Sequence, residues 1–249
     1  MPFQRQQLSI MKLSSLLYII TIFSYAQNTC TQKGIIDAIT PFSTEQGRKS
    51  PLIKAKININ EKDISPLLMQ KTPYLGFIGA DKKRLRIDFT VQKQGKRTYT
   101  MKGSTMVDKN KRTFEGNITV DTLYAFALPS YGVDDEYKGE VKEEGIVIAT
   151  YELEEDPKQS ATGVFKGKLF VKWYVDNKNR FLYDYIDDDS DAYFNNSFLG
   201  TWTSYKTGKS KPCNWGLHRI PCAGDLDGGA AEFMPTEKYY EYGWKNYTP

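Results

Sequence analysis

The segment from residue 84 to residue 91 alternates strictly between polar and apolar side chains. Leu85, Ile87, Phe89 and Val91 fall on one face, and the four residues between and before them are polar. A period of two is typical of a β-strand that buries one face and exposes the other. Comparable runs lie near 52–60, 74–78, 96–107, 112–121, 145–154, 163–176, 179–186 and 197–206. The chain is therefore predicted to be all-β.

Turn-forming residues separate these runs, so consecutive antiparallel hairpins are expected. An aromatic-x-Gly motif opens several runs: Tyr74–Gly76, Phe114–Gly116, Phe165–Gly167 and Phe198–Gly200. Glycine permits the sharp coiling of a closing sheet, and an aromatic ring on the same face covers the bare backbone. We predict an antiparallel barrel or barrel-like sandwich of about eight or nine strands, with irregular N- and C-terminal segments.

Residues 1–26 are predicted to be a signal peptide. The apolar run 13–23 is too short for a membrane helix, and Ser24-Tyr25-Ala26 places small residues where a signal peptidase reads them. The remaining chain is expected to be secreted or periplasmic, without a transmembrane span. It is interpreted as a single domain of three parts: an N-terminal segment 27–50, a β core 51–206 and an aromatic-rich C-terminal segment 207–249.

Helix is predicted to be scarce. One or two turns are expected at 34–39 and at 64–69, and Thr236 is expected to cap a short helix that runs to Tyr242 and ends at Gly243. The segments 27–50 and 207–249 do not alternate and are not predicted as strands. The second of these segments holds Trp215, Phe233, Tyr239, Tyr240 and Trp244 among its aromatic residues, so it is expected to fold back over the barrel.

Charge is distributed unevenly along the chain. Residues 27–112 hold 18 basic and 7 acidic side chains, whereas residues 113–249 hold 14 basic and 23 acidic ones. A basic half can bind nucleic acid or anionic lipid, but these basic residues alternate with apolar ones, as in 53–57. A solvated sheet face that pairs with acidic strands is therefore the favoured interpretation, and no nucleic-acid partner is predicted.

The three cysteines leave more than one pairing open. Cys213 and Cys222 lie close together in sequence, and an exported protein meets an oxidising compartment, so a local disulfide between them is the first choice. Cys30 paired with Cys213 is the second choice, and three reduced thiols are the third. One thiol stays unpaired in either disulfide arrangement.

Composition argues against most catalytic and metal-dependent chemistries. The chain has one histidine, His218, and no serine in a nucleophile elbow, so neither an imidazole relay nor a histidine-rich zinc site is expected. The acidic run 187–191 resembles the opening of a calcium loop, but Ala192 and Phe198 stand where that loop needs Gly and Glu. A solvated turn is favoured there. No catalytic residue, metal or cofactor is predicted.

Aromatic residues are the richest resource, with 17 Tyr, 13 Phe and 4 Trp. Burial in a core is their commoner role, and the alternative is a pocket or an exposed platform. The candidate ligand-binding residues are Trp173, Trp202, Phe198 and Trp215. The predicted function is a non-catalytic binding or interaction module for a small apolar ligand, a glycan or another envelope protein. The rival is a carbohydrate-binding module or a glycan hydrolase with exposed aromatics and paired carboxylates.

Several motifs carry a resemblance to a group of proteins. They are Ser24-Tyr25-Ala26-Gln27, Tyr74 to Gly79, Phe114 to Val120, Gly200 to Tyr205 and Cys213 to Gly216. With them the chain resembles uncharacterised secreted β-rich proteins of Bacteroides-type bacteria, and the resemblance implies no activity. Gly200-Thr201-Trp202 is also similar to the Gly-x-Trp of lipocalins, where it marks the first barrel strand. Here it lies on the last predicted strand, which implies only a lipocalin-like shape.

Overall fold

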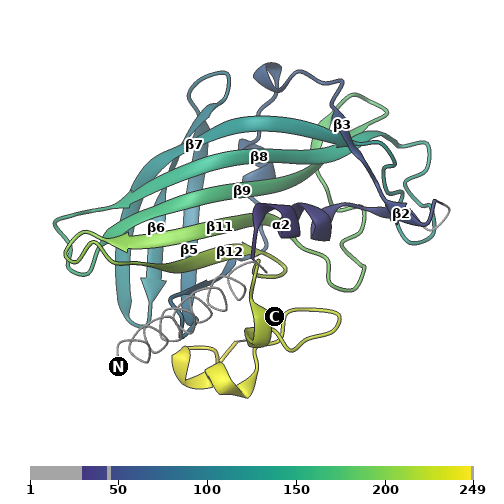
Figure 1. The fold of residues 1–249 in the computed structure, drawn as a ribbon. Helices are drawn as coiled ribbons and strands as arrows, with labels where there is room; N and C mark the ends of the chain where they lie inside the picture. Colours follow the sequence, from purple (N-terminus) through teal and green to yellow (C-terminus); the bar gives the residue numbers. More distant parts are fainter. Residues whose placement is uncertain (1–29, 44–45, 248–249) are drawn as a thin grey trace, which may run out of the picture.

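A computed structural model describes residues 30–43 and 46–247, so the predicted signal peptide, 1–26, lies outside the described residues. Eight antiparallel strands close into a barrel (Figure 1). They are β4 (Leu75–Ile78), β5 (Lys83–Lys93), β6 (Thr98–Val107), β7 (Asn110–Phe126), β8 (Val141–Glu155), β9 (Gly163–Asp176), β11 (Asn195–Ser204) and β12 (Ser210–Leu217). Each pairs with its neighbour in this order, and β12 pairs with β4 to close the ring. The predicted antiparallel barrel is confirmed.

Short elements extend the barrel. β3 (Leu52–Lys54) adds to the end of β7, β10 (Phe181–Tyr183) adds to the end of β9, and β1 (Phe42–Ser43) with β2 (Arg48–Lys49) forms a separate ribbon. The helices are α2 (Gln32–Ile39), α3 (Ser65–Leu68) and the 3₁₀ turns η1 (Ile59–Glu61), η2 (Gly224–Leu226) and η3 (Glu237–Tyr242). Helix makes up 11% of the structure, well below the roughly 30–35% of an average domain.

The predicted end of the β core at residue 206 is wrong, because β12 lies beyond it. Cys213 and Trp215, two residues apart, point inward from β12 and are fully buried, as a period of two requires, although residues 213–217 are all buried. Lysine, proline and glycine dilute that pattern in 207–212, which is why the sequence favoured an irregular segment there. The stretch is the last wall of the barrel, and its pairing with β4 completes the ring.

Two of the four glycines of the aromatic-x-Gly motifs, Gly167 and Gly200, are covered by the side chain of Tyr151, whereas a Cβ at Gly116 would meet the backbone of β8. A Cβ at Gly167 would lie 2.7 Å from Oη of Tyr151, and a Cβ at Gly200 would lie 2.4 Å from the same oxygen. Tyr151 stands directly opposite Gly167 on β8. The expectation that an aromatic ring covers bare backbone is therefore met at these two positions, but across strands, so one tyrosine covers two glycines.

Helix α2 covers part of the outer face of the barrel. Thr31 caps it by accepting a hydrogen bond from the backbone N–H of Gly34 at 3.1 Å. Ile35 and Ile39 on its inner face pack with Ile146 and Phe170, which point outward from β8 and β9. This contact explains why those two strands are apolar on both faces.

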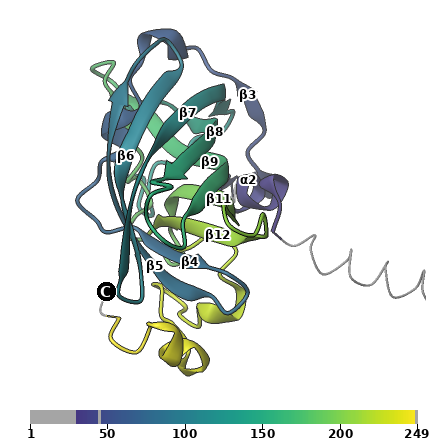
Figure 2. The ribbon, with the colours of Figure 1, turned by 90° about the vertical axis from the view of Figure 1, so that its left-hand side faces the viewer.

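The C-terminal segment packs beside β4 and β5, as expected for its aromatic content (Figure 2). Thr236 precedes η3, and Gly243 ends it with φ of +95°, a left-handed conformation that favours glycine. The turn brings Trp244 back to the barrel, where its indole N–H donates to the carbonyl of Lys82 at 2.8 Å. Phe233 and Trp244 pack against Phe77 of β4 in a small second core.

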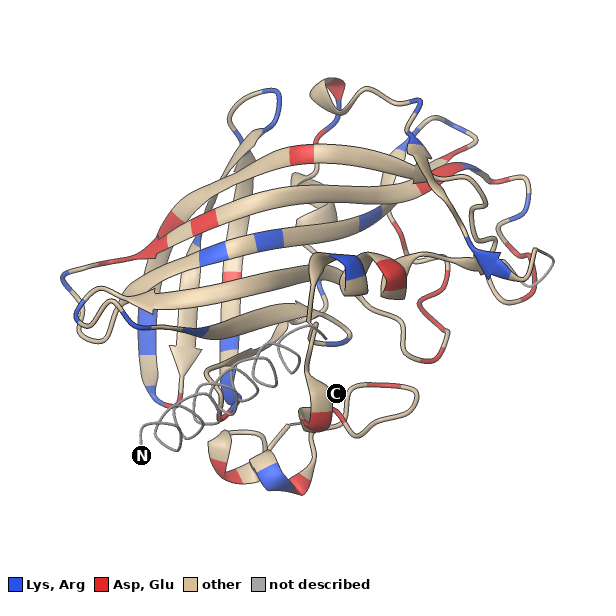
Figure 3. Ribbon diagram, in the orientation of Figure 1, with Lys and Arg blue, Asp and Glu red and all other residues tan. Residues whose placement is uncertain are grey.

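Charged side chains pair across neighbouring strands on the outer surface. Figure 3 shows basic and acidic positions on neighbouring strands of the barrel. Lys102 of β6 lies 2.8 Å from Glu115 of β7, and Lys82 lies 2.6 Å from Asp225 of the C-terminal segment. These two pairs join the basic and acidic halves of the chain, as the alternating pattern predicted. Within the described residues, no helix combines the length and hydropathy needed to cross a membrane.

Candidate functional site

The four predicted ligand-binding residues all lie inside the barrel. Trp173, Phe198 and Trp215 have no exposed surface, and Trp202 is 9% exposed at one end. Trp202 of β11 stands opposite Phe165 of β9, and Phe165 lies eight residues before Trp173 on the same strand. At 3.3 Å per residue this separation is about 26 Å. Trp173 and Trp202 therefore lie toward opposite ends of the barrel and do not share one site.

The middle of the barrel is filled by stacked rings. Phe198 and Trp215 lie 4.7 Å apart between ring centroids with an angle of 17° between their planes. Tyr151 packs edge-on against Trp215 at 5.2 Å, and Phe165 does so at 5.9 Å. All four side chains are at most 1% exposed. Aromatic rings at these separations pack as they do in protein cores, so in this structure Phe198 and Trp215 act as core residues.

One end of the barrel is closed by a buried carboxylate. Glu155 accepts hydrogen bonds from Nε1 of Trp202 at 2.8 Å, from Oγ1 of Thr105 at 3.0 Å and from the backbone N–H of Gly163 at 3.0 Å. Burial raises the pKa of Glu155, and these hydrogen bonds act in the opposite direction. Trp202 is thus held by the barrel's own side chains.

The predicted Cys213–Cys222 disulfide is wrong, and so is the alternative Cys30–Cys213. The structure joins Cys30 to Cys222, with 5.5 Å between their Cα atoms. Cys213 is a free thiol that points into the barrel, whereas Cys222 lies in the turn after β12 and packs near α2 on the outside. The sheet wall separates these two residues, a fact that their closeness in sequence could not reveal.

A cavity of about 650 Å³ lies on the side of the barrel, and we call it the flank pocket. It is lined by residues 72–75, residues 84–87 of β5, three residues of the β10–β11 loop (184–194), His218, residues 231–233 and Tyr247. The strands supply one wall, and irregular segments supply the others. No single stretch of sequence therefore encodes this pocket.

Aromatic side chains and the single histidine meet in the flank pocket. Tyr193 and His218 pack edge to face with 4.9 Å between their ring centroids, and Phe233 packs against Tyr247 at 5.3 Å. His218 has φ of +65°, and burial lowers its pKa although Asp188 acts to raise it. A neutral imidazole at neutral pH follows from that direction.

Ser190 also lines the flank pocket, so a serine, a histidine and an aspartate lie around one cavity. The hydroxyl of Ser190, however, donates to the backbone carbonyl of Asp187 at 2.6 Å. His218 makes no hydrogen bond to Ser190 in the described part of the chain. The relay that activates a serine nucleophile needs that hydrogen bond, so the arrangement is not a catalytic triad.

Arg84 is the most unusual charged group of the flank pocket. Its Cζ lies 5.4 Å from the ring centroid of Trp244 and 5.3 Å from that of Tyr247. Burial lowers the pKa of Arg84, and the neighbouring charge of Arg86 lowers it further. Among the described residues, no carboxylate forms an ion pair with either arginine. Arg84 is thus half-buried and held by ring faces, and its N–H donors have no acceptor among residues 30–43 and 46–247.

A buried ionic cluster lies beneath the β10–β11 loop. Nζ of Lys172 is 3.0 Å from Oδ2 of Asp184, and both side chains are almost fully buried. Glu144 is also fully buried, and its pKa is raised, first by burial and then by the charge of Asp184. Lys172 also lies 5.1 Å from the ring centroid of Tyr193. The cluster therefore anchors the loop that carries Tyr193 into the flank pocket.

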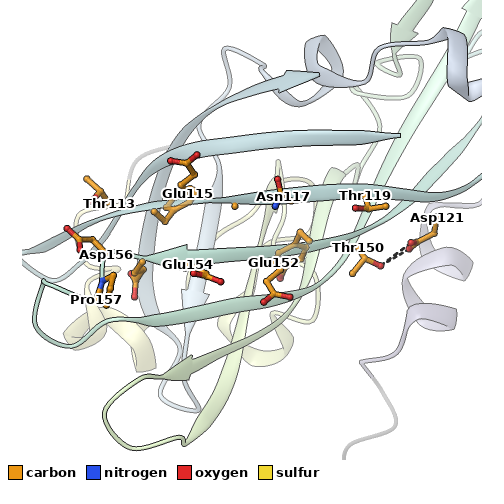
Figure 4. A pocket seen from close by; sticks show the side chains of 14 residues that line it. Thr113, Glu115, Asn117, Thr119, Asp121, Thr150, Glu152, Glu154, Asp156 and Pro157 are labelled. Carbon is orange, nitrogen blue, oxygen red and sulfur yellow. Dashed lines mark hydrogen bonds between the residues drawn. The ribbon is translucent and has the colours of Figure 1, made fainter. Parts of the chain in front are cut away.

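A second hollow, of about 870 Å³, runs along the outer faces of β7 and β8 (Figure 4). Figure 4 shows Glu115, Asp121, Glu152 and Glu154 along these strands, with Thr150 donating to Asp121. Lys102, Lys166 and Lys168 pair with three of these carboxylates. No exposed aromatic ring lines the hollow, and within the described residues no group of three or more His, Cys, Asp or Glu side chains could hold a metal ion.

The sequence contained weak signals for the flank pocket. Arg84 and Arg86 stand on the polar face of the most regular alternating run, where solvated residues are expected. His218 is the single histidine, and no motif around it indicated a pocket. No local motif joins β5 to residues 188–193 or 231–233, because those segments meet only after the barrel closes.

Comparison of the chain with protein-family models, with curated proteins and with solved structures found no match.

Proposed function

We propose that this protein is an exported, non-catalytic binding module whose ligand site is the flank pocket. The observation that carries the proposal is a contrast in space: aromatic rings fill the barrel, whereas a cavity of about 650 Å³ with aromatic walls lies beside it. Ligand pockets are commonly about 300–1,000 Å³, mostly apolar and provided with a few polar groups. The flank pocket has that size and that mixture.

The lining favours a small ligand that is partly apolar. Tyr74 and Tyr247 are partly exposed and offer ring surface, Tyr193 and Phe233 line the cavity but are almost fully buried, and His218 adds a polar group. The disulfide between Cys30 and Cys222 supports export, because disulfides persist in oxidising compartments. The hollow over β7 and β8 lacks a stacking platform, so it gives little support to a carbohydrate-binding or glycan-hydrolysing role.

Filling the flank pocket tests the proposal. Ala231 is exposed at its rim, and its neighbour Ala230 is exposed but does not line it. The variant Ala231→Trp should occupy the pocket, and Ala230→Trp is the matched control. Benzyl alcohol, a small neutral aromatic probe, should shift the amide resonances of Tyr193, His218 and Phe233 in the wild type and in Ala230→Trp, but not in Ala231→Trp.

Titration to about 10 mM detects dissociation constants in the millimolar range. Shifts confined to residues on the β7–β8 surface, or identical shifts in Ala231→Trp and the wild type, would remove the flank pocket as the site. Turnover of an ester or a glycan that one carboxylate substitution abolishes, with the fold retained, would replace the binding module by an enzyme.

A further inference from the structure

The chemistry of Arg84 narrows the class of ligand for the flank pocket. Its guanidinium is half-buried, and its contacts are to the rings of Trp244 and Tyr247. These rings leave the edge of the guanidinium without a hydrogen-bonded partner among the described residues. That edge is a planar fork of donors, and a carboxylate or a phosphate matches it with two parallel hydrogen bonds.

Arg86 adds a second positive charge to the same wall. It lies two residues from Arg84 on the outer face of β5, is exposed, and also lines the flank pocket. Two neighbouring cations without an ion-paired carboxylate repel one another. An anion placed beside them relieves that repulsion, whereas a neutral ligand does not.

Two acidic residues, Asp188 and Glu232, also line the flank pocket. Both are exposed to solvent, although partial burial and then the charge of Asp189 raise the pKa of Asp188. The charge of Asp188 acts on His218, and that of Glu232 acts on Tyr247. Within the described residues, neither forms an ion pair with Arg84. Arg86, Asp188 and Glu232 are exposed whereas Arg84 is half-buried, so the cation of Arg84 is the least hydrated of these four charges.

We infer that the flank pocket binds a small oxyanion, a carboxylate or a phosphate monoester carried on an aromatic group, with Arg84 as its principal anion receptor. The inference rests on the proposed function and specifies its ligand class. The oxyanion accepts hydrogen bonds from Arg84, Arg86 adds long-range attraction, and the partly exposed rings of Tyr74 and Tyr247 provide apolar surface for the aromatic part.

The test uses three probes that differ in charge but share a ring. Benzoate and phenyl phosphate are the anions, and benzamide is the neutral analogue of benzoate. Titrations of the whole protein, followed by amide chemical shifts at low ionic strength, should show benzoate or phenyl phosphate binding about tenfold or more tightly than benzamide. The anion that binds more tightly shows whether the pocket prefers a carboxylate or a phosphate monoester.

Variants assign the effect to Arg84. Arg84→Gln should weaken the binding of both anions about tenfold and leave the binding of benzamide unchanged. Arg84→Lys keeps the positive charge but loses the planar pair of donors, so it should weaken anion binding less. Lys102→Gln removes one positive charge elsewhere on the barrel and should change nothing. Thermal unfolding of each variant is recorded alongside, and Arg84→Lys carries the test if Arg84→Gln does not fold.

The outcomes separate the inference from the proposed function. Equal binding of benzoate and benzamide in the flank pocket overturns the inference and leaves the binding module standing. An anion preference that survives both substitutions of Arg84 also overturns it. No shift of the pocket resonances with any of the three probes overturns the inference and the proposed function together.

Discussion

The barrel interior and the flank pocket are both rich in aromatic side chains, but they use them differently. In the interior, Phe198 and Trp215 stack on one another and have no exposed surface. In the flank pocket, Tyr74 and Tyr247 are partly exposed and border a cavity. Aromatic content alone therefore does not identify a binding site. A ring is available to a ligand only where neighbouring elements fail to cover it.

The largest expected effect comes from Trp215→Ala, which removes the central ring of the interior. The lost contacts and the remaining cavity should lower the free energy of unfolding by about 3–5 kcal/mol. The flank pocket should be lost with the barrel, because Trp215 pairs with Gly76 of β4 and the adjoining residues 72–75 line the pocket. Denaturant unfolding followed by far-UV circular dichroism measures the change.

Trp244→Ala is the matched variant on the side of the flank pocket. It removes a ring that contacts Arg84 and belongs to the small C-terminal core. Probe binding should weaken while the strand signal of the barrel stays. Equal loss of strand signal in Trp215→Ala and Trp244→Ala would contradict the separation of the two regions.

Removing the disulfide should affect the irregular segments more than the strands. Cys30 and Cys222 close a loop that spans 192 residues of sequence, and such a link stabilises a fold by about 2–5 kcal/mol. In the double variant Cys30→Ala/Cys222→Ala, amide hydrogen exchange should speed up in α2 and around Cys222, with the barrel strands still protected. Alkylation of the unfolded, unreduced wild type should label Cys213 alone. Labelling of Cys30 instead would refute the Cys30–Cys222 pairing.

The smallest expected effect concerns Glu144, beneath the loop that forms one wall of the flank pocket. Its pKa is raised above the ordinary value of 4.5, so the folded protein holds this proton more tightly than the unfolded chain does. The stability that this proton contributes is complete below about pH 4.5, and it is lost as the pH rises through the raised pKa of the folded protein.

Glu144→Gln cannot ionise, so its free energy of unfolding should decline less than that of the wild type as the pH rises above about 5. Glu154→Gln, on the exposed face of β8, is the control and should follow the wild type. Parallel profiles for Glu144→Gln and the wild type would show that this carboxyl does not titrate in that range.

The strands could be predicted from the sequence more completely than the candidate binding site and the disulfide. Alternation located β5 to β9 and β11 almost completely, because a period of two follows from the backbone geometry of any half-buried strand. It missed β12, whose Lys211, Pro212 and Gly216 weaken the pattern. The position of η3 was found through its terminal residues, and Gly243 ends it in the left-handed region as predicted. The predicted capping by Thr236 is wrong, because its hydroxyl donates to the carbonyl of Asp225 and makes no capping hydrogen bond.

The ligand-binding candidates stay untested by the structure, but their placement shows why sequence favoured them. Large aromatic residues mark both cores and pockets, and Trp173, Trp202, Phe198 and Trp215 all face inward. Only the packing of the closed barrel distinguishes the two roles. The cysteines pose the same problem, because the side of the sheet on which Cys213 lies depends on the pairing of β12.

The all-β class, the positions of most strands and the return of the C-terminal aromatics to the barrel could all be predicted from sequence. These features depend on local geometry and on which face of a segment is apolar. The closure of the barrel, the Cys30–Cys222 pairing and the flank pocket that holds Arg84 beside Tyr247 depend instead on tertiary contacts. Each joins residues far apart in sequence, and such contacts form only when distant segments are brought together.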